Sequence, residues 1–170
     1  MTETANASLQ DKTRKGQPVL VAIDFSEDSR AALLWAGEYA RRIEAALILL
    51  HVVHDPASNP GFYRQEQKEE LLPMQQLAEE MMDDFLAEMK QEYSGLDWLD
   101  LARTELISGM PSGRIVEMAE LLGAGTIVIG SRGLTGLPHM LLGSVAERVV
   151  ELASIPVVVV KADSKVDDCG

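Results

Sequence analysis

The chain has 170 residues, of which 46% are hydrophobic, 25% charged and 5% aromatic, and its net charge is −12. This length suits one domain with an aliphatic core, and the acidic excess excludes nucleic acid and anionic membranes as main partners, because both require a positive protein surface. No apolar run reaches the ~20 residues that cross a bilayer, and residues 1–17 lack the apolar core of a secretory signal. The single Cys169 has no partner for an internal disulfide, so we expect a cytoplasmic protein.

The acidic charge is concentrated in one internal segment. Residues 66–105 contain 12 acidic and 3 basic residues, whereas residues 106–161 contain 4 of each. An acidic run of this kind is typical of a solvated helix face, with partner docking as the alternative. The balanced segment leaves room for a site that binds a small anion.

The first third of the chain predicts a strand, a helix and a second strand. Residues 18–24 are a short aliphatic run, rich in β-branched side chains, that ends at Asp24. Ser26 is an N-cap candidate for a helix over 28–44. Residues 46–53 form another aliphatic run, which is typical of a buried strand.

A long helix is expected in the middle of the chain. Residues 55–61 contain Pro, Asn and Gly and break regular structure, and a polar stretch continues to about residue 72. The helix is predicted over 73–93, with Pro73 in its first turn. Apolar side chains recur along it and are expected to face the core: Met74, Leu77, Met81, Met82, Phe85 and Met89.

The last third predicts three more strands with helices between them. The strands are 102–107, near a sheet edge, then 126–130 and 156–160, and the helices are 111–122 and 144–154. Strands that alternate with helices at this spacing predict an α/β fold, with one open sheet of five parallel strands and helices on both faces. The first, second and fourth strands are the most apolar and should be central.

If the first and fourth strands are neighbours, a ligand site is expected where they end, because open α/β sheets bind ligands at the carboxyl ends of their strands. Asp24 ends the first strand, and a glycine-rich loop follows the fourth. Gly130 and Gly133 allow backbone N–H groups to approach an anion, and Arg132 adds a positive charge. Ser144 is at the start of a helix, whose N-terminal dipole favours negative charge. The alternative is an ordinary turn followed by a helix cap at Ser144.

The spacing in this loop distinguishes it from two other phosphate motifs. The chain has no Gly-Lys-Ser/Thr, and no G-x-G-x-x-G follows the first strand. Instead, Gly130, Gly133, Gly143 and Ser144 form the pattern G-x2-G-x9-G-(S/T), which resembles the nucleotide-binding signature of the universal stress protein family. Three further stretches are similar to strands of that family: VAIDFS at 21–26, LLHV at 49–52 and PVVVV at 156–160. The resemblance covers about residues 17–162.

The resemblance implies an adenine-nucleotide α-hydrolase-like sheet of order 3-2-1-4-5, with ATP, ADP or AMP between the first and fourth strands. It implies nucleotide-binding roles for ten residues: Ala22, Asp24, Val52, Ile129, Gly130, Arg132, Gly133, Gly143, Ser144 and Val145. Asp24 would face the ribose, the backbone of Val52 would bind adenine, and Ala22 and Ile129 would line the pocket. The other six would hold the phosphates. Any Mg²⁺ would be bound through phosphates and Asp24, and no residue has a dedicated catalytic role.

The resemblance also implies a homodimer that forms through the last strand, over Val157, Val158, Val159 and Val160. An unpaired apolar edge is an aggregation hazard, which independently favours dimerisation. We expect residues 18–162 to form the nucleotide-binding domain, with a flexible arm over 1–17 and a tail over 163–170.

The histidines do not predict a metal site. His51, His54 and Asp55 are close in sequence, but neighbouring strand residues point to opposite faces of a sheet. His51 is therefore expected to be a hydrogen-bonded structural residue.

The function predicted from these features is nucleotide-dependent binding or signalling in a stress response. One alternative is a slow Mg²⁺-dependent ATPase of the same fold, although no general base for phosphoryl transfer is evident. The other is an interaction module that binds no nucleotide and whose glycine loop is only structural.

Overall fold

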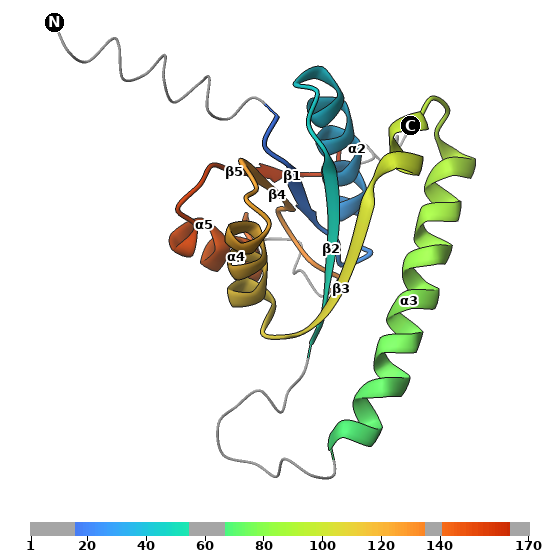
Figure 1. Cartoon of the computed structure of the whole chain (residues 1–170), viewed down its shortest axis with the longest axis vertical. Helices are drawn as coiled ribbons and strands as arrows, with labels where there is room; N and C mark the ends of the chain where they lie inside the picture. The colour runs from blue at the N-terminus through green and yellow to red at the C-terminus, as the bar shows by residue number, and fades with distance from the viewer. Residues whose placement is uncertain (1–15, 55–66, 135–140, 164–170) are drawn as a thin grey trace, which may run out of the picture.

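Five parallel strands form one sheet in the order β3-β2-β1-β4-β5 in the computed structural model of the chain, which describes residues 16–54, 67–134 and 141–163 (Figure 1). The strands are β1 (Val19–Ala22), β2 (Leu47–His54), β3 (Arg103–Gly109), β4 (Thr126–Gly130) and β5 (Val157–Val160). The helices are α2 (Glu27–Arg42), α3 (Gln67–Glu92), the 3₁₀ helix η2 (Asp97–Leu101), α4 (Pro111–Leu121) and α5 (Ser144–Leu152). The predicted fold class and strand order are confirmed.

The centre of the sheet is buried on both faces. All four residues of β1 and all five of β4 are buried, which explains their uniformly aliphatic sequences. In the register of the sheet, Ala22 is opposite Leu50 on β2 and Ile129 on β4. β2 continues beyond this point to His54, and there it pairs with β3. The carboxyl ends of β1 and β4 therefore lie side by side, next to the longer β2.

Alternate side chains of the sheet enter two separate hydrophobic clusters. Val19 and Val21 belong to a cluster with α2, α3 and η2, which we call the α2/α3 face. Leu20 and Ala22 belong to a cluster with α4 and α5, which we call the α4/α5 face. Figure 1 shows α4 and α5 together on one side of the sheet, away from α2 and α3. This division follows from the two-residue period of a strand.

The α2/α3 face contains a contact that the sequence analysis missed. Trp98 on η2 is only 9% exposed and lies against Gly37 of α2. A Cβ atom at Gly37 would lie 2.3 Å from the indole ring, so only glycine leaves room for Trp98 here. The η2 segment was not predicted because five residues are too few to show a helical period.

The predicted start of the long helix is wrong. α3 begins at Gln67, so Pro73 lies inside the helix rather than in its first turn. The preceding sequence QKEELL consists of strong helix formers, which can extend the helix on the N-terminal side of a proline. The acidic side chains of its described part, including Glu79, Asp83 and Asp84, are exposed, as expected for a solvated face.

The predicted core stripe of α3 is only partly correct. Phe85 and Met89 are buried together with Met82, but Leu77 and Met81 are 56% and 40% exposed. Met74 is also exposed. Residues four apart drift by about 40° around a helix of 3.6 residues per turn, so a stripe with this spacing leaves the core within three steps.

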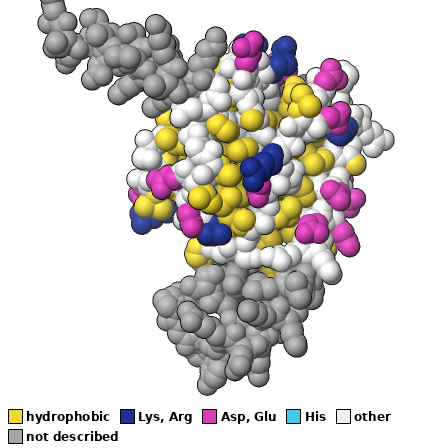
Figure 2. All heavy atoms as spheres, viewed as in Figure 1, with side chains coloured by type: hydrophobic (Ala, Val, Ile, Leu, Met, Phe, Trp, Pro, Cys, Tyr) yellow, Lys and Arg dark blue, Asp and Glu magenta, His cyan; other side chains and the backbone are white. Residues whose placement is uncertain are grey.

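The surface view shows how charge is distributed around the sheet. On the face drawn in Figure 2, hydrophobic side chains gather near the middle and acidic side chains lie along the side on which Figure 1 places α3.

Within the described part of the chain, no helix combines the length and apolar character that crossing a membrane requires.

Candidate functional site

A cavity of about 260 Å³ opens at the carboxyl ends of β1, β2 and β4. All ten residues of the predicted site line it, so the structure brings the predicted set together. Seven further lining residues were not predicted: Ile23, Leu50, His51, Pro111, Ile115, Ser131 and Ala146. Pro111 and Ile115 come from the first turns of α4, which follows β3, and the sequence offered only their apolar character as a signal.

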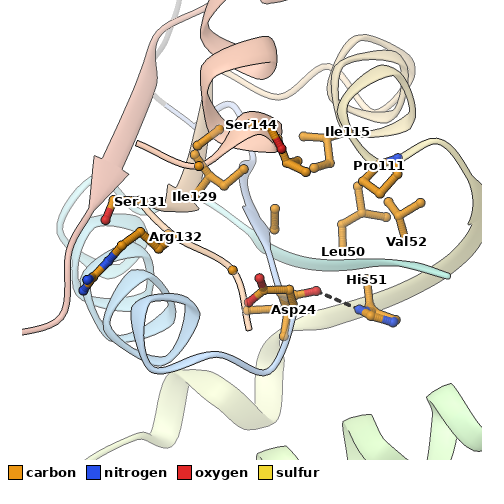
Figure 3. A pocket seen from close by; sticks show the side chains of 17 residues that line it. Asp24, Leu50, His51, Val52, Pro111, Ile115, Ile129, Ser131, Arg132 and Ser144 are labelled. Atoms are coloured by element: carbon orange, nitrogen blue, oxygen red, sulfur yellow. Dashed lines mark hydrogen bonds between the residues drawn. The ribbon is translucent and has the colours of Figure 1, made fainter. Parts of the chain in front are cut away.

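One side of the cavity is apolar. In Figure 3, Leu50 and Val52 of β2 lie opposite Pro111 and Ile115 of α4, with Ile129 near Ser144. Ala22 lies between β2 and β4, and its small side chain leaves space that a larger residue would fill. An apolar slot of this kind is typical of sites that bind small organic molecules.

The backbone of Val52 points into this slot. The Ile23 N–H donates to the Leu50 carbonyl at 2.8 Å, so the backbone groups of Leu50 point toward β1. Those of Val52 point the same way, because alternate residues of a strand repeat their orientation. Since β1 ends at Ala22, opposite Leu50, the N–H and C=O of Val52 face the cavity rather than a neighbouring strand. This edge offers one donor and one acceptor next to each other.

Asp24 lies at the polar end of the cavity, and its two carboxylate oxygens have different surroundings. Oδ1 accepts hydrogen bonds from the backbone N–H of Ser26, at 3.1 Å, and from the Ser26 hydroxyl. Oδ2 is directed toward Gly133, where a Cβ atom would lie 2.8 Å from it. One oxygen of Asp24 therefore stabilises the turn before α2, and the other remains available in the crevice.

His51 is hydrogen-bonded, as predicted. Its Nδ1 lies 2.7 Å from the carbonyl oxygen of Ile23, the contact that is dashed in Figure 3. Its ring packs against Phe25, with 4.5 Å between centroids. Phe25 has a φ of 67°, so this contact supports a strained turn between β1 and α2. His51 thereby helps to position Asp24.

The three glycines of the G-x2-G-x9-G pattern have different surroundings. A Cβ at Gly130 would lie 2.8 Å from the backbone of Asp28, so this residue permits close packing of β4 on α2. The Gly143 N–H donates to the Ser131 carbonyl at 2.6 Å, which closes the loop at the start of α5. Of the three, Gly133 is the one whose missing side chain leaves space beside Asp24.

The N-terminus of α5 faces the same crevice. Gly143 is its N-cap residue and contributes no side-chain hydrogen bond, so the N–H groups of the first turn are left for another acceptor. Ser144 and Val145 both line the cavity. The exposed N–H groups and the helix dipole favour a bound anion.

Arg132 does not present its charge to the cavity. Its Nε lies 3.3 Å from Oδ2 of Asp28, and its side chain points away from Asp24 in Figure 3. Asp28 is only 4% exposed and also accepts hydrogen bonds from the Ser131 hydroxyl at 2.6 Å, the Arg132 N–H at 3.0 Å and the Ala162 N–H at 3.0 Å. We call this group the Asp28 cluster.

The ionisation of Asp28 reflects these contacts. Burial raises the pKa of Asp28, but the hydrogen bonds from Ser131, Ala162 and Arg132 lower it by more, so that its pKa lies below the usual value. The carboxylate is therefore the form that the cluster stabilises. In the sequence, residue 28 was recognisable only as the first residue of a predicted helix, because the partners of Asp28 lie more than a hundred positions away in the chain.

A metal ion would need ligands from a bound molecule. The residues that the structure describes contain no group of three or more His, Cys, Asp and Glu that could hold one. His54 is exposed, and Asp55 lies outside the described residues. The free oxygen of Asp24 is a suitable ligand for Mg²⁺, which commonly combines one or two carboxylates with phosphate oxygens.

Comparisons with known proteins agree with this arrangement. The sequence model of the universal stress protein family matches residues 16–161. A universal stress protein of Methanocaldococcus jannaschii is 33% identical over 160 residues, which cover 94% of this chain and 91% of the relative. The solved universal stress protein UspA of Lactobacillus plantarum is similar in fold, with a TM-score of 0.68 and 24% identity over 86% of this chain and 98% of the other.

Two other solved structures with this fold are described as nucleotide complexes. One is a universal stress protein of Archaeoglobus fulgidus in complex with dAMP, with a TM-score of 0.50, 24% identity and coverage of 85% of this chain and 98% of the other. The second is a universal stress protein in complex with cAMP, with a TM-score of 0.54, 23% identity and coverage of 87% and 98%. At these identities the two structures show a shared fold alone. The match of the family model over nearly the whole chain, together with the archaeal relative, shows that this chain belongs to the universal stress protein family.

Proposed function

We propose that this protein binds an adenine nucleotide in the cavity between β1 and β4, and that occupancy of the site controls its binding to other molecules in a cytoplasmic stress response. The observation that carries the proposal is the position of Val52, Asp24 and Gly133 around one cavity. Val52 offers a backbone N–H and C=O, Asp24 offers a carboxylate oxygen, and Gly133 offers a loop without a side chain. The structures with dAMP and cAMP support it by showing that this fold accommodates adenine nucleotides elsewhere in the family.

Each part of a nucleotide has a matching surface. The adenine ring would lie in the apolar slot between β2 and α4 and exchange hydrogen bonds with the Val52 backbone. The ribose would lie near Ala22 and Ile129, with its hydroxyls toward Oδ2 of Asp24. The phosphates would lie over Gly133 and the N-terminus of α5, where N–H groups can donate.

The proposal favours binding over hydrolysis. Among the described residues that line the cavity, Asp24 is the only carboxylate, and one of its oxygens is occupied by Ser26. With Asp24 bound to the ribose hydroxyls, the described lining offers no second carboxylate as a general base for attack on the γ-phosphate, so any ATP hydrolysis should be slow. Single-turnover hydrolysis with radiolabelled ATP measures this directly, and a rate of several turnovers per second would contradict it.

Direct nucleotide binding tests the proposal. The protein is purified without added nucleotide, denatured, and its released small molecules are analysed by mass spectrometry, and calorimetry then measures the Kd of AMP, ADP and ATP in the presence of Mg²⁺. The variant Gly133→Val places a branched side chain against Asp24 and should abolish binding. Gly113→Val is the matched control, because a Cβ there meets nothing within 4 Å. Absence of binding to the wild-type protein, or full binding by Gly133→Val, would contradict the proposal.

We also propose that the protein is a homodimer in which β5 pairs with its copy. In the described part of the sheet, β5 pairs with β4 alone, and Val159 is 37% exposed. The opposite edge strand, β3, instead carries the charged residues Arg103 and Glu105. Charged side chains protect an edge from pairing, whereas an edge of valines invites it.

The dimer is tested by a charge on the β5 edge. Val159→Lys should convert the protein to a monomer in sedimentation-velocity experiments. Leu121→Lys is the control, because Leu121 is 74% exposed on α4. A wild-type protein that sediments as a monomer at micromolar concentration would contradict the homodimer.

A further inference from the structure

The phosphate end of the cavity has less positive charge than the presence of Arg132 in the loop sequence indicates. Asp24 and Arg132 are the only Asp, Glu, Lys or Arg residues among the described ones that line the cavity. Arg132 is paired with Asp28, so the charge that remains free at this end is the carboxylate of Asp24. A phosphate group bound here would depend on neutral donors, namely the N–H groups of the loop and α5 and the Ser144 hydroxyl.

Asp28 contacts both the side chain and the backbone of Arg132. Both carboxylate oxygens of Asp28 contact its guanidinium, at 3.3 Å and 3.5 Å, and its own backbone N–H donates to the same carboxylate. If the guanidinium turned toward a phosphate, Asp28 would remain buried without a cation, and separating a buried carboxylate from its cation is unfavourable. The Ser131 hydroxyl and the Ala162 N–H would not replace that charge.

Neutral donors and a nearby carboxylate favour ligands with little charge. A helix N-terminus carries only a fraction of a positive charge, roughly +0.5, which can offset a single phosphate in part. Each additional phosphate brings more negative charge close to Asp24, and the repulsion is strong in a partly buried site. A divalent cation would relieve it, and Oδ2 of Asp24 offers a hard oxygen ligand beside Gly133.

On the basis of the proposed function, we infer that Asp28 is a specificity-determining residue: by withdrawing Arg132 from the cavity, it makes the site bind adenosine monophosphates without metal and triphosphates only with a divalent cation. Asp28 does not touch the nucleotide. It acts through Arg132, and its effect is on the relative affinities for nucleotides of different charge.

The wild-type protein provides the first test. Calorimetry at about 0.15 M salt measures the Kd of AMP and of ATP, each in EDTA and in excess Mg²⁺. The Kd of AMP should change less than about twofold between the two conditions, whereas ATP should bind at least ~tenfold more weakly in EDTA, which corresponds to one unfavourable charge interaction. If ATP in EDTA binds as tightly as AMP, the inference is wrong although the proposed function stands. If neither nucleotide binds in any condition, the proposed function fails first.

Two variants separate the roles of the charges. Arg132→Gln should leave the Kd of AMP within about threefold of wild type and keep the metal dependence of ATP, because the guanidinium does not serve the phosphates. A loss of more than ~tenfold for both nucleotides would show that Arg132 binds phosphate directly and would overturn the inference. Asp28→Asn retains the side-chain shape and releases the charge of Arg132, so ATP binding in EDTA should tighten at least ~fivefold while AMP changes less.

A control and a fold check complete the design. Asp100→Asn removes the same charge from η2, where Asp100 is exposed and paired with Lys90, and it should leave all four affinities unchanged. Circular dichroism reports whether Asp28→Asn is folded. If that variant does not fold, the wild-type and Arg132→Gln measurements still decide between the two outcomes.

Discussion

The two faces of the sheet receive similar aliphatic side chains from the strands but differ in what covers them. On the α2/α3 face, large side chains such as Phe85, Met89 and Trp98 fill the space over β1 and β2. On the α4/α5 face, Ala22 and the first turns of two helices meet at the carboxyl ends of the strands and leave a cavity of about 260 Å³. One face stabilises the fold, and the other combines stability with an open site.

The largest effect is expected on the filled face. Phe85 is 4% exposed, packs edge-on against Phe25 with 5.6 Å between centroids and lies under the guanidinium of Arg30. Phe85→Ala should reduce the free energy of unfolding by about 4 kcal/mol, because it leaves a cavity among packed side chains. Urea denaturation measures the change. A loss below about 1 kcal/mol would mean that this face is not tightly packed.

The same substitution on each face makes the comparison direct. Ala36 lies on the filled face and is fully buried, whereas Ala22 lines the cavity. Ala36→Leu should cost about 3 kcal/mol through overpacking, and Ala22→Leu less than about 1 kcal/mol because the cavity accepts the added carbons. Ala22→Leu should also weaken AMP binding at least ~tenfold by filling the slot. Equal losses of stability for the two variants would contradict the distinction between the faces.

The Asp28 cluster joins α2 to the segments that follow β4 and β5, and its contribution to stability should depend on pH. Asp28→Asn should lower the free energy of unfolding by about 2 kcal/mol near neutral pH, because buried donors lose a charged acceptor. The pKa of Asp28 in the folded protein is below the ordinary value of 3.8, so the stabilisation is complete above that value and is lost as the pH falls through the lower folded pKa. The free energies of unfolding of the wild-type protein and the variant should therefore become similar in acid. A difference that stays constant down to pH 2 would show that the carboxylate charge is not involved.

The smallest effect is expected on the exposed side of α3. Leu77 is 56% exposed although its spacing predicted a core position. Leu77→Gln should change the free energy of unfolding by no more than about 0.5 kcal/mol, as is usual for exposed positions. Met82→Gln, at a position that is 1% exposed, is the control that should be strongly destabilising. Similar losses for the two variants would place Leu77 in a core contact.

The sheet and the lining of the site could be predicted because they depend on local signals. Buried parallel strands such as β1 and β4 are uniformly aliphatic, and their alternation with helices indicates one parallel sheet, whereas the order of the strands was implied by the family resemblance. The carboxyl ends of parallel strands share one edge, so residues at those ends must meet. This is why Asp24 and Gly133, far apart in sequence, line the same cavity as expected.

The contacts that were missed join residues with no local signal. Arg132 was expected to serve phosphates because its loop position is all that the sequence displays, whereas its pairing with Asp28 depends on how α2 packs against β4. The contact of Trp98 with Gly37 is similar, since a glycine inside a helix gives no sign of what fills the space above it. The predicted start of α3 was wrong because a proline is typical of a first helical turn, whereas here the strong helix formers before Pro73 extend the helix to Gln67.

The Asp28 cluster also has a consequence for folding kinetics. Its hydrogen bonds join Asp28 to residues 103, 104 and 134 positions later in the chain, and Ala162 follows the last strand. Contacts between residues so far apart in the chain have a high entropic cost of loop closure, so they form late in folding. The cluster should therefore be absent from the folding transition state, so that Asp28→Asn accelerates unfolding while the folding rate stays nearly constant. In the native protein, the hydrogen bond from the Ala162 N–H to this carboxylate would slow the separation of β5 from the sheet.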